Sequence, residues 1–81
     1  FASRYRQHNG MKPIHAGKVM RVLTDHGFVL VRQKGSHTIW KHTRSGIIVP
    51  VPLHGKSKPI HIGTLYAIIK QSRIPPEEFM P

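Results

Sequence analysis

Two short strands joined by a two-residue turn constrain this chain more than any other feature of its sequence. Residues 28–34 (FVLVRQK) are rich in β-branched and aromatic side chains and are bounded by glycines, which is typical of a strand. Gly35-Ser36 follows, and residues 37–42 (HTIWKH) form a second strand-like run. Two such runs separated by a glycine-containing pair predict an antiparallel hairpin.

A third strand is expected directly after the hairpin. Residues 43–46 (TRSG) form a second turn, and residues 47–51 (IIVPV) have the composition of a strand. Pro50 and Pro52 cannot donate hydrogen bonds to a neighbouring strand, so this third strand is expected either to lie at the edge of the sheet or to end early.

The segments on either side of these strands show helical spacing. In residues 14–26 apolar side chains recur at three- and four-residue intervals, namely at Ala16, Val19, Met20 and Leu23. Residues 62–73 place apolar residues on one face in the same way, namely Ile62, Leu65, Ile68 and Ile69. Gly27 suits the end of the first helix, because glycine adopts the left-handed conformation at low cost.

The order of elements predicts an α+β fold, α-β-β-β-α, with two helices on one face of a three-stranded antiparallel sheet. The length of 81 residues suits a single domain with one modest core. We expect residues 1–10 to be a flexible basic N-terminal extension, and residues 11–81 to form the domain with a short C-terminal tail.

The net charge of the chain limits the classes of partner that it is expected to bind. Thirteen Lys and Arg residues against three acidic residues give a net charge of +10, which favours polyanions such as nucleic acid, an anionic membrane surface or an acidic protein. No apolar run is long enough to span a bilayer. The chain has no cysteine, which excludes disulfides and thiol catalysis. We therefore expect a cytoplasmic protein that is not membrane-bound.

His37 is the candidate catalytic residue. Side chains alternate between the two faces of a strand, so His37, Ile39 and Lys41 share one face. The large aromatic side chain of Trp40 is expected on the other face, against the helices. His37 is therefore predicted on the open face, close to the turn that carries Lys34.

RNA is the substrate that fits this arrangement. A neutral imidazole at His37 can remove the proton of a 2′-hydroxyl, and nearby cations can stabilise the charge that develops on phosphorus. Ser36 either binds a phosphate oxygen or satisfies the turn backbone. The cations expected to contact RNA phosphates at this site are Arg32, Lys34 and Lys41.

A metal site and a cofactor are not expected. His37 and His42 lie an odd number of positions apart on one strand and so face opposite ways. His54 and His61 flank a loop and can converge, but no third ligand is evident. The few carboxylates also argue against magnesium.

A family resemblance supports the catalytic interpretation. Residues 25–37 (DHGFVLVRQKGSH) resemble the core of the HicA-type mRNA interferase toxins, in which a helix ends in Gly-aromatic and an apolar strand leads to Lys-Gly-Ser-His. The similarity continues through residues 49–52 (VPVP) and 63–71 (GTLYAIIKQ) and covers about residues 11–74. Arg73 departs from the family, where glycine is common.

The resemblance implies a double-stranded-RNA-binding-like fold and endoribonuclease activity on single-stranded mRNA, centred on His37. It also implies that a HicB-type antitoxin neutralises the toxin by covering that site. The sequence does not indicate an oligomeric state.

Two other functions compete with this one. The fold order and charge also suit a non-catalytic double-stranded-RNA-binding module, which reads A-form geometry through phosphates and 2′-hydroxyls. Such modules usually carry lysines at the start of the last helix, whereas here Lys56 and Lys58 lie upstream in the loop and are expected to steer RNA electrostatically. A module that binds an acidic protein is the third possibility, and Ile39 on the open face favours some protein contact.

Overall fold

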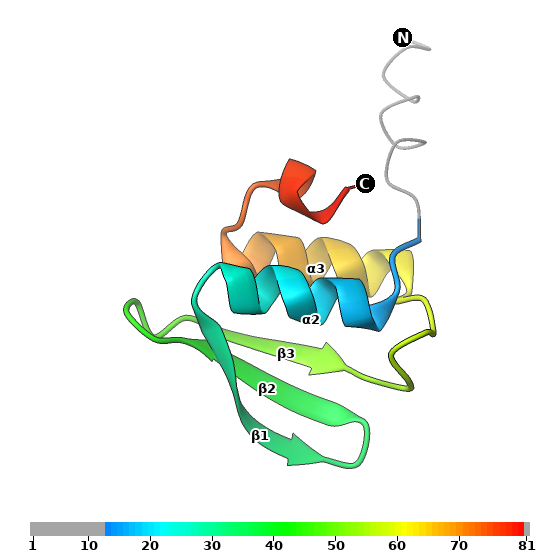
Figure 1. Ribbon diagram of the computed structural model, residues 1–81, viewed down its shortest axis with the longest axis horizontal. Helices are drawn as coiled ribbons and strands as arrows, with labels where there is room; N and C mark the ends of the chain where they lie inside the picture. Colours follow the sequence, from blue (N-terminus) through cyan, green and yellow to red (C-terminus); the bar gives the residue numbers. More distant parts are fainter. Residues whose placement is uncertain (1–12, 81) are drawn as a thin grey trace, which may run out of the picture.

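Two helices cover one face of a three-stranded antiparallel sheet (Figure 1). The computed structural model describes residues 13–80, so the extension expected at residues 1–10 lies outside the described residues. The elements, in chain order, are α2 (Ala16–Asp25), β1 (Phe28–Lys34), β2 (His37–His42), β3 (Ile48–Pro52), α3 (Ile62–Ser72) and the short 3₁₀ helix η1 (Pro76–Phe79). This confirms the predicted α-β-β-β-α order.

The core lies between the helices and the sheet. Helix α2 buries Ala16, Val19, Val22 and Leu23, and helix α3 buries Leu65, Ile68, Ile69 and Ser72. Ile62 was expected on the buried face of α3 but is 37% exposed, because it is the first residue of the helix and the buried face begins one turn later at Leu65. Gly27 has a φ of 91° and ends α2 as predicted.

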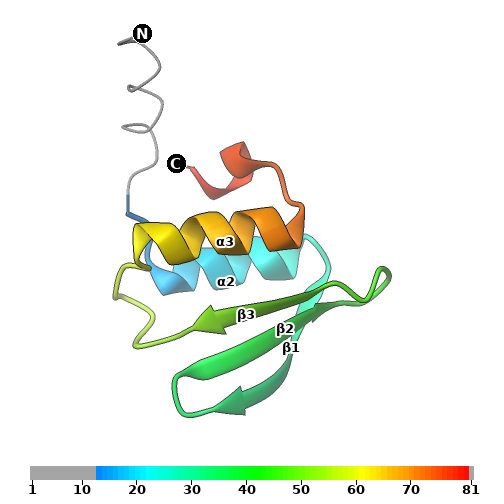
Figure 2. The same ribbon diagram turned by 180° about the vertical axis from the view of Figure 1, so that it is seen from behind.

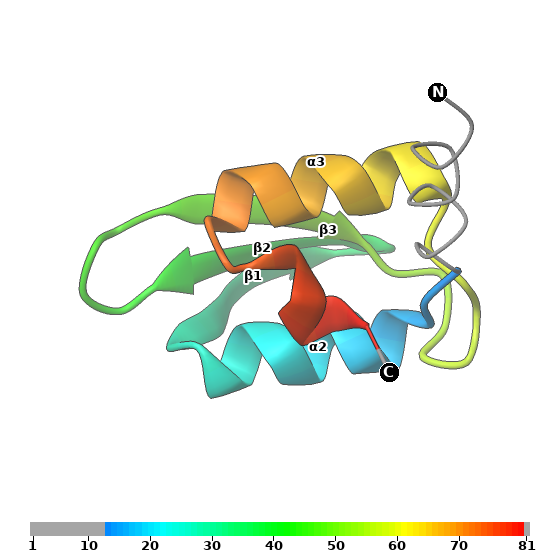
Figure 3. The same ribbon diagram turned by 90° about the horizontal axis from the view of Figure 1, so that it is seen from above.

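The C-terminal segment closes the core on the side away from the sheet. Figure 3 shows η1 crossing between α2 and α3 above the helix layer, and Phe79 of η1 is fully buried. Oε1 of Glu78 in η1 lies 3.3 Å from Nε2 of His26, the residue that caps the end of α2. The C-terminal segment therefore packs against α2.

Strand β2 lies at the centre of the sheet, between β1 and β3. It turns Thr38 and Trp40 towards the helices, where both are buried, as predicted for Trp40. The hydroxyl of Thr38 donates to the Val51 carbonyl at 2.6 Å and accepts from the Trp40 indole nitrogen at 3.1 Å. One hydroxyl thus satisfies two polar groups in the core.

The third strand is an edge strand, as its prolines predict. It begins and ends one residue later than expected, at Ile48 and Pro52. Across residues 13–80, no helix combines the length and the apolar composition needed to cross a membrane.

We predict that Thr38→Val destabilises the domain by about 1–3 kcal/mol, because valine has nearly the same shape but leaves the Trp40 indole nitrogen unpaired in the core and removes the hydroxyl bond to the Val51 carbonyl. Urea unfolding followed by Trp40 fluorescence measures the change. Thr43→Val, in the exposed turn after β2, is the matched control. Equal midpoints for the two variants would contradict the role assigned to the Thr38 hydroxyl.

Candidate active site

The turn between β1 and β2 fixes the position of His37. Lys34 pairs with His37 across the hairpin, which leaves only Gly35 and Ser36 in the turn. Gly35 has a φ of 60°, whereas Ser36 does not have a positive φ. This combination is typical of a type II′ turn, whose twist matches that of the flanking strands. The Ser36 carbonyl also accepts from the Leu53 amide at 2.6 Å, which ties the turn to the end of β3.

A β-bulge decides which way the cations of β1 point. Leu30 pairs with Trp40, but the next pair along β1 is Arg32 with Ile39, so Val31 is an extra residue. Without the bulge, Arg32 would lie on the same face as Phe28, towards the helices. The extra residue reverses the alternation, because paired residues in an antiparallel sheet share a face.

The result is a shallow hollow of about 260 Å³ on the open face of the sheet. Its lining consists of Arg32, Lys34, His37 and Ile39. His37 is exposed, so its imidazole is accessible to a ligand. No carboxylate lines the hollow, and two of its four side chains are cationic. The hollow is therefore suited to a phosphate group beside an accessible imidazole.

Two other predicted residues lie near the hollow without lining it. Ser36 is in the turn beside His37 and is half-buried. Lys41 shares the open face with His37, as strand alternation predicts, but it pairs with Val29 and Ile48 further along the sheet. Lys41 lies four positions from His37 along β2, a rise of about 13 Å. Lys41 therefore lies too far along the strand to contact the same phosphate as His37.

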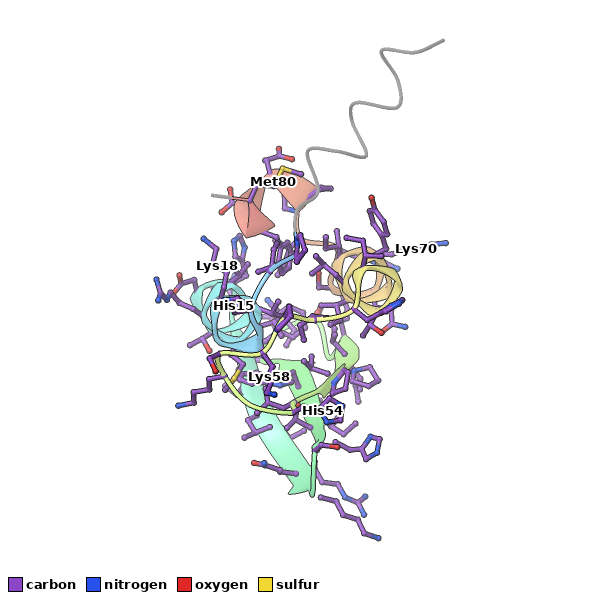
Figure 4. All side chains as sticks on the ribbon, turned by 90° about the vertical axis from the view of Figure 1, so that its right-hand side faces the viewer. His15, Lys18, His54, Lys58, Lys70 and Met80 are labelled. Atoms are coloured by element: carbon purple, nitrogen blue, oxygen red, sulfur yellow. The ribbon has the colours of Figure 1, made fainter. Side chains whose placement is uncertain are left out.

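Lys56 and Lys58 lie on the loop between β3 and α3, away from the His37 hollow. Their carbonyls accept from the first amides of α2, Gly17 to Lys56 and Ala16 to Lys58, each at 3.0 Å. Figure 4 shows Lys58 and His54 on this loop. The Lys58 side chain lines a separate hollow of about 280 Å³ with His54, His61 and Thr64. The structure therefore does not bring these lysines to His37.

The histidines of the described part of the chain do not gather around a metal position. Among residues 13–80, no group of three or more His, Cys, Asp or Glu side chains is placed to hold a metal ion. His42 has a structural role on the face opposite His37. Its Nδ1 accepts from the amides of Arg44 and Ser45 at 3.1 and 3.0 Å, and its ring packs edge-on against Phe28.

Sequence reasoning placed Ile39 on the open face with His37, where the hollow contains it, but did not find the bulge. A signal was present, because residues 28–31 are four consecutive apolar residues and break the alternation expected of a half-buried strand. Such a run requires either a strand buried on both faces or an irregularity. The structure has the irregularity.

Together, the fold and site define a small basic α+β domain with one accessible histidine in a cation-lined hollow. The family model described as the HicA toxin of bacterial toxin–antitoxin systems matches residues 16–74. This range includes both helices and the whole sheet, and the chain belongs to the HicA toxin family. Comparison with curated protein sequences finds no match. The resemblance noted in the sequence is thus confirmed.

We predict that Gly35→Ala destabilises the domain by about 1–2 kcal/mol, since a side chain disfavours a φ of 60°. No atom lies within 4 Å of a Cβ built at Gly35, so the effect is conformational rather than steric. Gly63→Ala in α3 is the control and is expected to leave stability equal or higher, because alanine favours helix. Urea unfolding measures the stability of both variants. An unchanged free energy of unfolding in Gly35→Ala would exclude the type II′ turn.

Proposed function

We propose that this HicA-family toxin is a metal-independent endoribonuclease that cleaves mRNA, with His37 as the catalytic base. The observation that carries the proposal is the hollow in which an accessible His37 lies with Arg32, Lys34 and no carboxylate. Family membership supports the toxin role.

The chemistry requires only groups that the hollow and the RNA supply. His37 removes the proton of a 2′-hydroxyl, and the resulting oxygen attacks the adjacent phosphorus. The bond from phosphorus to the 5′ oxygen breaks, and that oxygen takes a proton from the Lys34 ammonium group in the hollow or from water. The products are a 2′,3′-cyclic phosphate and a free 5′-hydroxyl.

The cations of β1 have an electrostatic role in this step. Arg32 and Lys34 line the same hollow as His37, so a phosphate bound there would lie beside both of them. Fixed positive charge stabilises the additional negative charge of the phosphorane, which lowers the barrier. We assign Ser36 to the RNA next to this phosphate, and Lys41, Lys56 and Lys58 to more distant phosphates along the strand.

Metal independence follows from the nucleophile. The 2′-hydroxyl is already part of the substrate, so no metal-bound water is needed to attack phosphorus. The donors in the hollow are cationic or imidazole groups, whereas magnesium binds oxygen ligands. DNA lacks the 2′-hydroxyl and would not be cleaved.

The partner of the toxin is proposed to be a HicB-type antitoxin that covers the His37 hollow. Ile39 supports this role, because it places an aliphatic side chain among the polar groups of the hollow. A protein partner can bury that side chain, whereas a phosphate gains nothing from it. We place the reaction in the cytoplasm, where mRNA is available.

We predict that His37→Ala lowers the rate of RNA cleavage in EDTA by at least about 100-fold, the usual contribution of a general base. His26→Ala is the matched control, since His26 lies at the end of α2 rather than in the hollow. Gel analysis of unstructured RNA measures both rates. Binding without cleavage in the unsubstituted protein would instead indicate the non-catalytic RNA-binding module, and a requirement for added metal would refute metal independence.

We also predict that Lys34→Ala lowers the salt dependence of RNA binding by about 0.7 in the slope of log K against log salt, the value for one phosphate contact on a single strand. Lys70→Ala is the control, because Lys70 lies on α3 in the helix layer (Figure 4). Binding is measured on the His37→Ala background so that RNA is not consumed. Equal slopes for the Lys34 and Lys70 variants would show that Lys34 does not contact an RNA phosphate.

A further inference from the structure

The two edges of the sheet differ in how they are protected. On one edge, β3 carries Pro50 and Pro52, which cannot donate to an added strand. On the other edge, β1 pairs only with β2, and its second side has no strand partner within residues 13–80. Strand β1 spans Phe28–Lys34 and contains no proline or glycine. Apart from the bulge at Val31, the outer backbone edge of β1 is therefore open to pairing with another chain.

This open edge is also apolar. Val29, Leu30 and Val31 are 45%, 43% and 50% exposed, and only Phe28 at the start of the strand is buried. Figures 1 and 2 show why, since β1 is the strand furthest from the helix layer when the molecule is viewed from either side. Natural proteins usually protect such an edge with charge, proline or a covering segment. Exposed aliphatic side chains on both faces of a strand with one unpaired edge indicate a binding surface along that edge.

We propose that the free edge of β1 is a docking surface for an extended acidic segment of a partner protein, which adds to the sheet as a fourth strand. In this mode of recognition, backbone hydrogen bonds supply affinity and alternate side chains supply specificity. The chemistry of the edge favours protein over RNA. Val29, Leu30 and Val31 are aliphatic and make favourable cross-strand pairs, whereas unpaired bases stack on aromatic side chains.

Charge identifies the occupant as acidic rather than as a second copy of this chain. Beyond the apolar stretch, the same strand carries Arg32 and Lys34, and the chain as a whole has a net charge of +10. Pairing two copies through β1 would bring two strongly positive chains together. A partner strand that places apolar residues opposite Val29 and Val31, and carboxylates near Arg32 and Lys34, complements both parts of the edge.

This inference rests on the proposed function in one respect. Arg32 and Lys34 belong both to the free edge and to the His37 hollow, so a strand added at β1 would lie beside the hollow. The added segment would then be the part of the antitoxin that approaches the active site. Docking itself does not require His37 to be catalytic.

The test uses a synthetic peptide of alternating glutamate and valine at millimolar concentration, with the His37→Ala protein. We expect slower hydrogen exchange of the outward-facing amides of β1 when the peptide is added. The same peptide N-methylated at alternate backbone nitrogens keeps its charge and side chains but cannot form the ladder. It is expected to give no protection. Protection by both peptides, or by neither, would overturn strand addition.

Two substitutions of matched exposure locate the surface. Val31→Glu is expected to weaken peptide binding by about fivefold or more, because it replaces one favourable cross-strand pair with a like charge. Ile48→Glu on β3 makes the same change at a residue that is 51% exposed, and is expected to have less than about a twofold effect. Equal effects of both substitutions would show a general charge effect and refute the β1 surface.

Two further results separate this inference from the proposed function. RNA cleavage by the unsubstituted protein without peptide binding would overturn the docking surface alone. Peptide binding without cleavage would overturn the enzyme and leave the docking surface in place. Concentration-dependent dimerisation that is lost in Val31→Glu would assign the edge to a second copy, contrary to the proposal.

Discussion

The extra residue in β1 is the feature on which the site depends. Before Val31, the strand turns Phe28 into the core and is anchored by it. After Val31, the alternation is reversed, and Arg32 and Lys34 lie with His37 on the open face. This seven-residue strand therefore contributes Phe28 to the core at one end and Arg32 and Lys34 to the hollow at the other. Its middle residues Val29, Leu30 and Val31 lie exposed between these two ends.

Most of the fold could be predicted because its boundaries depend on local chemistry. Strands β1 and β2 have the predicted bounds, since glycines at both ends and a two-residue turn leave little freedom. Gly27 illustrates the strength of such a signal. Its φ of 91° disfavours a side chain, and a Cβ there would lie 2.9 Å from Nε2 of His42, so glycine is required for two separate reasons.

The candidate site was less predictable because it depends on pairing register and on long side chains. Strand alternation placed His37 and Trp40 on their observed faces, but the orientation of Arg32 and Lys34 follows from the bulge, which the partner strand determines. Lys41 shares the face of His37 yet pairs further along the sheet. Lys56 and Lys58 are held by backbone bonds to α2, and that long-range contact has no local signature in the loop sequence.

The two proposals together suggest how a toxin of this size can be controlled. An RNA phosphate in the hollow and an acidic strand at the edge of β1 would both require the positive charge of Arg32 and Lys34. Two ligands that need the same cations exclude one another even where their other contacts do not overlap, because each guanidinium or ammonium group can neutralise only nearby negative charge. The partner would then inhibit the toxin without distorting the turn that holds His37. It would need only to occupy β1, the strand that carries Arg32 and Lys34.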